Sequence, residues 1–234
     1  MKFNTVAKNH RLKAALVSAF LLLTSQAAHA GGIALGATRV IYSQGEKQAT
    51  LPIINSTDNG TFLIQSWVSK PDDSKSPDFV LTPPLFVIHP KKENTLRIMY
   101  TGPKLPTDKE SLFYLNVKAI PSVDKSQLKG NTLQIATQSV IKLFVRPKNL
   151  PTQAINAPKS LTCSISGSNL IVKNPTPYYV TMVNLYVGGQ KLHNTMVAPQ
   201  NKAEVSIPGG KTGAVTFETV NDFGANTPKQ SCAK

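Results

Sequence analysis

Apolar and polar residues alternate through most of the chain, a pattern that predicts β-strands. In the first two thirds the alternating segments are Gln48–Asn55, Thr61–Lys70, Phe79–Thr82, Leu85–His89, Asn94–Thr101, Ser111–Ile120 and Asn131–Pro147. Such strands, at spacings near ten residues, are typical of an antiparallel sandwich of about a hundred residues. No convincing 3.6-residue amphipathic pattern appears, so the fold class expected is all-β.

Two of these segments carry residues that depart from a simple strand. Pro52, inside Gln48–Asn55, favours an edge position or a bulge because proline cannot donate to a ladder. In Asn131–Pro147, Leu133, Ile135 and Thr137 fall on one face, whereas Lys142 lies inside an apolar run. A lysine in that setting either extends its ammonium to solvent or places a positive charge in a cleft.

A second group of strands follows a proline-rich stretch. Residues 147–158 hold three prolines and no strand pattern, which predicts a linker at 150–158. Beyond it the alternating segments are Ser160–Ile165, Asn169–Lys173, Tyr178–Val187, Ala203–Ile207 and Ala214–Val220. We therefore expect two β-sandwiches in tandem, at 31–149 and 159–234.

The first thirty residues predict a signal peptide. Four basic residues precede the apolar run Ala14–Leu23, and Ala28-His29-Ala30 gives the small residues that a signal peptidase needs. The run is too short for a permanent span, and no other long apolar segment occurs. We expect cleavage after Ala30, export in soluble form without membrane insertion, and a mature charge of 22 − 12 = +10.

Charge and cysteine content narrow the function. The lysines are scattered and form no stripe with interleaved aromatics, which argues against nucleic acid as a partner. A positive surface would still speed encounters with acidic partners. In an oxidising compartment, Cys163 and Cys232 most simply form one disulfide, which stabilises a domain by roughly 4 kcal/mol in the chain-entropy model.

The sequence offers little catalytic chemistry. His89 and His193 have no partner at metal-ligand spacing, and the GxSxG, HExxH and phosphate-loop motifs do not occur. A carboxylate pair among the twelve acidic residues stays open, although nothing in the pattern favours one. We predict a protein that is not an enzyme and that needs no metal or cofactor.

Several phrases, in order along the chain, resemble the periplasmic chaperones of the chaperone–usher pilus pathway, such as those of type 1 and P pili. They cover essentially all of residues 33–228. The phrases are GATRVIY at 36–42, TPPL at 82–85, ESLFYLN at 110–116, KAIP at 118–121, IKLFVRP at 141–147, NPTPYY at 174–179 and NDFG at 221–224.

The resemblance implies two immunoglobulin-like sandwiches set as a boomerang in a periplasmic protein. The partners implied are pilin subunits, whose own sandwich lacks a strand, and an outer-membrane usher that receives them. The last strand of the first domain would fill the subunit's groove. Whether the free protein covers that strand by self-association is left open.

The resemblance also assigns residues. Leu133, Ile135 and Thr137 would enter the subunit groove, although Thr137 is smaller and more polar than the family pattern has there. Without the resemblance, Leu133 and Ile135 would instead be taken to face the protein's own core. Arg39 and Lys142 match the two cations that anchor the subunit's C-terminal carboxylate.

Further matches concern the arrangement of the two domains, a proline peptide bond and a loop. Glu110, Arg146 and Asp222 match an ion network that holds the two domains at their working angle. Thr82-Pro83-Pro84 implies a cis proline, and the short connection at 122–130 implies the short-loop branch that serves rod-like pili. The disulfide is not part of the resemblance, because the family varies there.

Two other classes share some of these features. A pilin or adhesin is also exported and immunoglobulin-like, but should carry an N-terminal donor extension and an incomplete sandwich. A secreted enzyme on a β-scaffold is the second alternative, which a screen for activity on generic substrates would test.

Overall fold

The computed structural model describes residues 31–123 and 133–233, and the predicted signal peptide, the connection at 124–130 and the start of the segment at 131 lie outside them. The first half of this described part forms nine strands. They are β1 (Ile33–Leu35), β2 (Arg39–Ser43), β3 (Ala49–Asn55), β4 (Phe62–Ser69), β5 (Phe79–Thr82), β6 (Leu85–Ile88), β7 (Glu93–Tyr100), β8 (Ser111–Pro121) and β9 (Thr137–Arg146).

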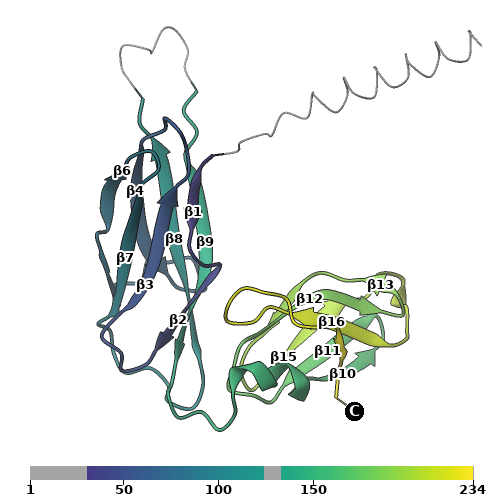
Figure 1. Cartoon of the computed structure of the whole chain (residues 1–234). Coiled ribbons are helices and arrows are strands. Elements are labelled where there is room, and N and C mark those ends of the chain that lie inside the picture. The colour runs from purple at the N-terminus through teal and green to yellow at the C-terminus, as the bar shows by residue number, and fades with distance from the viewer. Residues whose placement is uncertain (1–30, 124–132, 234) are drawn as a thin grey trace, which may run out of the picture. The chain divides into compact units, whose positions relative to one another are not determined.

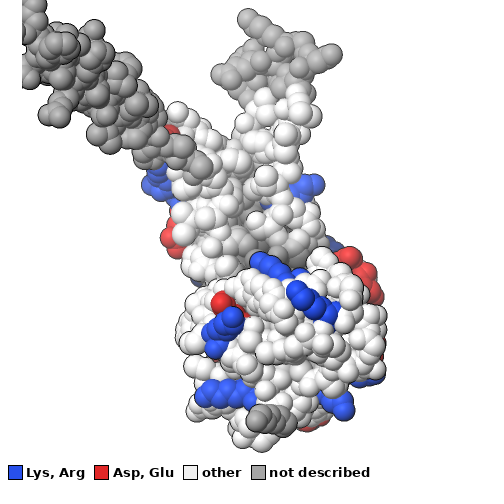
Figure 2. Space-filling view, turned by 90° about the vertical axis from the view of Figure 1, so that its right-hand side faces the viewer, with Lys and Arg blue, Asp and Glu red and all other residues white. Residues whose placement is uncertain are grey.

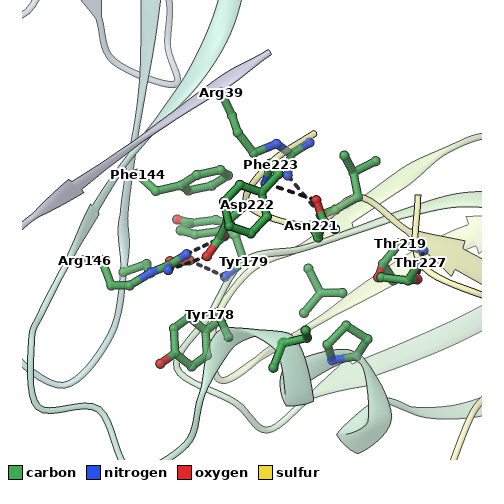
Figure 3. A pocket seen from close by; sticks show the side chains of 16 residues that line it. Arg39, Phe144, Arg146, Tyr178, Tyr179, Thr219, Asn221, Asp222, Phe223 and Thr227 are labelled. Atoms are coloured by element: carbon green, nitrogen blue, oxygen red, sulfur yellow. Dashed lines mark hydrogen bonds and ion pairs between the residues drawn. The ribbon is translucent and has the colours of Figure 1, made fainter. Parts of the chain in front are cut away.

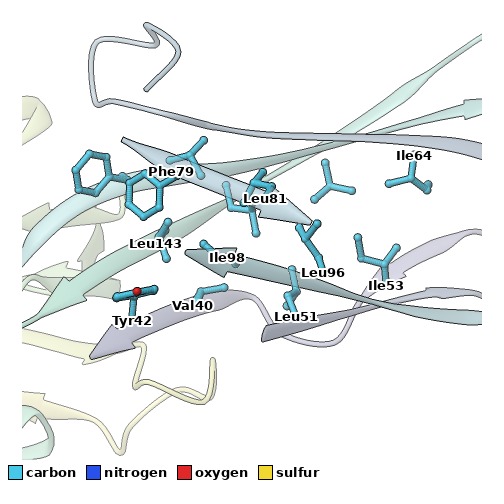
Figure 4. Close-up of a cluster of buried hydrophobic side chains, with 14 of the residues drawn as sticks. Val40, Tyr42, Leu51, Ile53, Ile64, Phe79, Leu81, Leu96, Ile98 and Leu143 are labelled. Carbon is cyan, nitrogen blue, oxygen red and sulfur yellow. The ribbon is translucent and has the colours of Figure 1, made fainter. Parts of the chain in front are cut away.

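These strands build two facing sheets, as Figure 1 shows. One sheet has the order β1-β3-β7-β5 and the other β2-β9-β8-β4-β6. Alternate residues of both sheets point inward, and Figure 4 shows Leu51, Ile53, Leu96 and Ile98 of the first sheet packed with residues such as Leu143 of the second. The predicted alternation is therefore the inward face of a sandwich.

Two short breaks carry the chain from one sheet to the other. The cis Thr82–Pro83 peptide lies between β5 and β6, which belong to different sheets, so the predicted cis proline is Pro83. Between β1 and β2 the chain passes so close to β3 that a Cβ on Gly36 would lie 3.0 Å from the Pro52 ring.

Pro52 lies where β1 ends rather than on an edge strand. Its carbonyl accepts from the Gly36 amide at 2.8 Å, so the missing N–H also faces the end of β1 and costs no bond to β7. The predicted edge position is wrong for β3 as a whole, because β3 pairs with both β1 and β7.

The segment predicted from Asn131 becomes a strand only at Thr137. The last register pair with β8 joins Ala119 to Thr137, and Leu133–Ala136 continue without strand pairing. At its other end β9 pairs in parallel with β2, from Arg39 and Lys142 to Ser43 and Arg146. A single strand thus has one neighbour in its first half and two in its second.

The second sandwich has its own core. Its strands are β10 (Thr162–Ser166), β11 (Asn169–Asn174), β12 (Val180–Val187), β13 (Gln190–Lys191), β14 (Thr195–Val197), β15 (Asn201–Ser206), β16 (Val215–Thr219) and β17 (Gln230–Ser231). They form the sheets β10-β11-β15 and β13-β12-β16-β17, with β14 also paired to β12. Cys163 and Cys232 form the predicted disulfide, which joins β10 to the end of the chain.

The stretch between the sandwiches is only partly extended. A 3-10 helix, η2, covers Ala154–Ser160, and Ala157 is buried in the second core while Leu150 packs against it. Among the described residues, no helix is long and apolar enough to cross a membrane.

Candidate functional site

Two groups of charged residues lie on and beside β2 and β9, where the first sandwich meets the second. The closed cluster consists of Arg146, Glu110 and Asp222, and the open cluster consists of Arg39 and Lys142. On β9, residues 142, 144 and 146 fall on one face because side chains alternate with period two. Both clusters therefore face β12 and the loop after β16.

The closed cluster joins one cation to two carboxylates. Arg146 Nε donates to Glu110 Oε1 at 2.6 Å, and its two terminal nitrogens donate to Asp222 at 2.7 and 2.8 Å. Burial alone would lower the pKa of Arg146, but the hydrogen bonds to Asp222 and the charge of Glu110 raise it above its ordinary value. The guanidinium also lies 5.2 Å from the centroid of the Tyr178 ring.

Glu110 connects this cluster to the second sandwich. Its second carboxylate oxygen accepts from the Tyr179 amide at 2.8 Å, and its own amide donates to the Pro177 carbonyl at 2.9 Å. Its side chain is only 2% exposed, so burial raises the pKa of its carboxyl despite the charge of Arg146. The structure thus brings the three predicted residues together in one satisfied network.

The open cluster has two cations and no carboxylate. Arg39 and Lys142 are register partners on the parallel strands β2 and β9, so their side chains project side by side. Within residues 31–123 and 133–233, neither forms an ion pair with an acidic residue. Their hydrogen bonds go to neutral oxygens, from Lys142 Nζ to Thr181 Oγ1 and from Arg39 Nη1 to the Val220 carbonyl, both at 3.0 Å.

Burial without an anion changes the titration of both cations. Burial, followed by the neighbouring charge of Arg39, lowers the pKa of Lys142 to about 8. Burial also lowers the pKa of Arg39, although Asp222 and Glu110 act in the opposite direction. The Nε of Arg39 is buried and has no hydrogen-bond partner among the described residues, so the cluster has an unused donor and uncompensated positive charge.

A pocket lies beside the open cluster, and Figure 3 shows Arg39, Phe144, Arg146 and Phe223 around it. The pocket is also lined by Ile155 of η2. Thr181, the Val220 carbonyl and Phe223 did not emerge as site residues from the sequence. An apolar residue inside the polar turn Asn221–Gly224 was the available signal for Phe223.

The predicted groove residues precede Lys142 of the open cluster in the same segment of the chain. Leu133 is 84% exposed and Ile135 is 65% exposed, and Thr137 is also exposed. The alternative that Leu133 and Ile135 face the protein's own core is therefore wrong. The edge of β9 opposite β8 carries no strand over residues 137–141, because β2 begins its pairing only at Lys142.

Two family models together match most of the described part of the chain. The N-terminal domain of the PapD pili and flagellar-assembly chaperone matches residues 32–151, and the C-terminal domain of the PapD pili assembly chaperone matches residues 156–231. The chain belongs to the pilus-assembly chaperone family. Membership agrees with the predicted two immunoglobulin-like domains and with a protein that is not an enzyme.

Relatives of this family are similar over nearly the whole chain. The probable fimbrial chaperone SfmC of Escherichia coli K12 is 51% identical over 220 residues, which cover 93% of this chain and 96% of SfmC. The probable fimbrial chaperone ElfD of the same strain is 49% identical over 92% of this chain and 94% of ElfD.

Two solved chaperone structures are also similar to most of this chain. The periplasmic chaperone SfaE shares 45% identity with a TM-score of 0.77, over 87% of this chain and 100% of SfaE. The SafB chaperone of Salmonella enterica, solved in complex with the SafA pilin, shares 31% identity with a TM-score of 0.78, over 87% of this chain and 96% of SafB.

The distribution of basic residues on the surface agrees with the prediction that nucleic acid is not a partner. Figure 2 shows Lys and Arg side chains in separate groups on the face in view, with no continuous stripe. Within the described residues, no group of three or more His, Cys, Asp or Glu side chains is placed to hold a metal ion.

Proposed function

We propose that this protein is a periplasmic chaperone that captures pilin subunits by adding the free edge of residues 133–141 to the subunit's incomplete sheet. The open cluster of Arg39 and Lys142 binds the subunit's C-terminal carboxylate. An outer-membrane usher then receives the subunit for assembly into a pilus.

The observation that carries this proposal is the open cluster itself. Two adjacent, partly buried cations without a carboxylate destabilise the free protein, and an anion that binds both removes this cost. A chain terminus suits the site, because a carboxylate accepts hydrogen bonds from a guanidinium and an ammonium together. The buried Nε of Arg39 provides one donor that no described group uses.

The second support is the strand edge next to the cluster. Backbone groups on one side of residues 137–141 have no strand partner, and apolar side chains at Leu133, Ile135 and Val140 are exposed. Such an edge binds an added strand through ladder hydrogen bonds, while alternate side chains enter pockets of the partner. An exposed apolar edge of this kind also favours self-association of the free protein.

The position of the cluster gives it a further role. Lys142 is the residue at which the free edge ends and pairing with β2 begins. An added strand whose terminus is held there has a fixed register, and a slip of one residue would turn every side chain to the wrong face. Thr137 would then select a subunit whose pocket at that level accepts a small polar side chain.

The proposal has three finer parts. Cleavage of the signal peptide after Ala30 is supported by the small residues Ala28-His29-Ala30. Transfer to an usher and service to rod-like pili are supported by the family resemblance, the latter through the short connection at 122–130. The role of the closed cluster in holding the two sandwiches at a working angle belongs with them; its support is that Glu110 and Asp222 both bind Arg146.

The test is co-purification from periplasm with the pilins of the same gene cluster, for the native protein, Lys142→Ala and Arg39→Ala. Removing one partner of a buried charge pair costs about 2–5 kcal/mol, so each variant should lose the one-to-one complex. Lys148→Ala is the matched control, because that lysine pairs with Glu46 on the surface.

Circular dichroism must show all variants folded. If the native protein captures no pilin, the proposed function is wrong. If it captures pilin and both variants do so equally well, strand addition stands but the carboxylate anchor is wrong.

A further inference from the structure

Phe223 has the most exposed large apolar side chain among the described residues, at 94%. It belongs to the loop between β16 and β17, next to Asp222 of the closed cluster. The role assigned to the open cluster requires no aromatic ring at this position. Its exposure is therefore unexplained by the fold or by the carboxylate anchor.

The loop that carries Phe223 is held by its own hydrogen bonds. The side-chain oxygen of Asn221 accepts from the amides of Phe223 and Ala225, both at 3.0 Å. Gly224 follows with a positive φ of 84°, and a Cβ there would collide with Thr38, the residue before β2. The ring is thus presented by an ordered turn that packs against the first sandwich.

This turn also positions the open cluster. Val220, at its start, accepts the Nη1 hydrogen bond from Arg39 at 3.0 Å, and Asp222 binds Arg146. Phe223 lines the same pocket as Arg39, as Figure 3 shows. On η2, Ile155 lines that pocket as well and is 69% exposed.

The pocket therefore combines Arg39, which has no ion pair among the described residues, with two exposed apolar side chains. A ligand that matches both has a carboxylate and an apolar group a few bonds apart, as the last residue of a polypeptide does. A strand added along residues 137–141 would end at Lys142, beside Arg39. The added chain itself delivers its final residue to this pocket.

We propose that Phe223 and Ile155 form an apolar subsite for the side chain of the subunit's C-terminal residue, whose carboxylate binds Arg39 and Lys142. The subsite favours subunits that end in an aromatic or large aliphatic residue. This inference rests on the proposed function and adds a selection step to it.

The experiment uses one captured pilin with its last residue set to Phe, Leu, Ser or Gly, all of which keep the terminal carboxylate. Dissociation constants are measured with the native chaperone, with Phe223→Ala and with Ile155→Ala. Val80→Ala is the matched control, because Val80 is an apolar residue 44% exposed on β5.

For the native chaperone we expect the Phe-ended subunit to bind about tenfold more tightly than the Gly-ended one. Phe223→Ala should reduce this preference to about twofold or less, Ile155→Ala should reduce it partly, and Val80→Ala should leave it unchanged. Since Phe223 is exposed, the melting temperature of the Phe223→Ala variant should match that of the native protein.

A preference that survives in Phe223→Ala, or equal weakening of all four subunits by that variant, would overturn the subsite. Capture of all four subunits by the native protein with equal affinity would overturn it too. Capture of none would instead show that the proposed function fails.

Discussion

The two charged clusters share strand β9, where Lys142 and Arg146 are four residues apart, and they differ in whether their cations have carboxylate partners. In the closed cluster Arg146 has two carboxylate partners, whereas in the open cluster Arg39 and Lys142 have only neutral oxygens. Both are partly buried, so burial alone does not separate them. What separates them is whether the fold itself supplies the anion, and the cluster that lacks one is the candidate for binding.

The largest effect should come from breaking the closed cluster. Arg146→Ala leaves Glu110, which is 2% exposed, and Asp222 without their cation, so we expect a loss of about 3–5 kcal/mol in the free energy of unfolding. Urea denaturation measures this change. Glu46→Gln, which removes an exposed pair with Lys148, is the control and should cost less than about 1 kcal/mol.

Arg39→Ala should change the unfolding free energy far less than Arg146→Ala, because no described carboxylate depends on Arg39 for an ion pair. Equal losses for Arg39→Ala and Arg146→Ala would remove the distinction between the clusters.

A second substitution would give the open cluster a carboxylate from the protein itself. Thr181 accepts from Lys142 at 3.0 Å, so Thr181→Asp places a carboxylate where the subunit terminus is proposed to bind. We expect a modest gain in the melting temperature of the free protein and a loss of roughly 2 kcal/mol in subunit affinity. Thr181→Asn, which adds no charge, is the matched control, and an equal loss with Asn would show that shape rather than charge is responsible.

The smallest expected effect is the change of subunit affinity with pH. The pKa of Lys142 is lowered to about 8, and a bound carboxylate would return it toward its ordinary value. Binding therefore takes up a proton above pH 8, and subunit affinity should be constant from pH 6.5 to 7.5 and fall by roughly tenfold by pH 9.5, allowing for solvent screening.

Over the same range the free protein should gain stability, since the unfolded chain holds more protons on this lysine than the folded one does. Isothermal titration calorimetry in buffers of different ionisation enthalpy would measure the proton uptake. Affinity that stays level to pH 9.5 would show that Lys142 does not face the bound anion.

The strand predictions show where local patterns suffice. Phe79–Thr82, where buried and exposed positions alternate without a break, was predicted with both boundaries, and Ser111–Ile120 was extended only by Pro121. Among the described residues of Asn131–Pro147, the strand begins later than predicted, at Thr137. Alternation continues through Leu133 and Ile135, but a strand needs a neighbour, and β8 pairs with β9 only as far as Thr137.

The site was predicted unevenly for a related reason. Lys142 stood out as a lysine inside an apolar run, but its role came from phrases shared with a family, as did Arg39, Glu110, Arg146 and Asp222. Thr181 and Phe223 were missed, because their importance comes from contacts with β9 and the pocket beside Arg39. Those contacts join residues 39 or more positions apart in the chain.

The sequence by itself determined the all-β class, the two groups of strands separated by a proline-rich stretch, and the pairing of the only two cysteines, since each depends on residue type and spacing. Only the tertiary structure decided which cations are neutralised. Arg146 and Lys142 are both basic residues on one strand, and what distinguishes them is the parts of the second sandwich that fold against each: a carboxylate for Arg146 and a hydroxyl for Lys142. Electrostatic energy depends on distances through space, which the order of residues does not state.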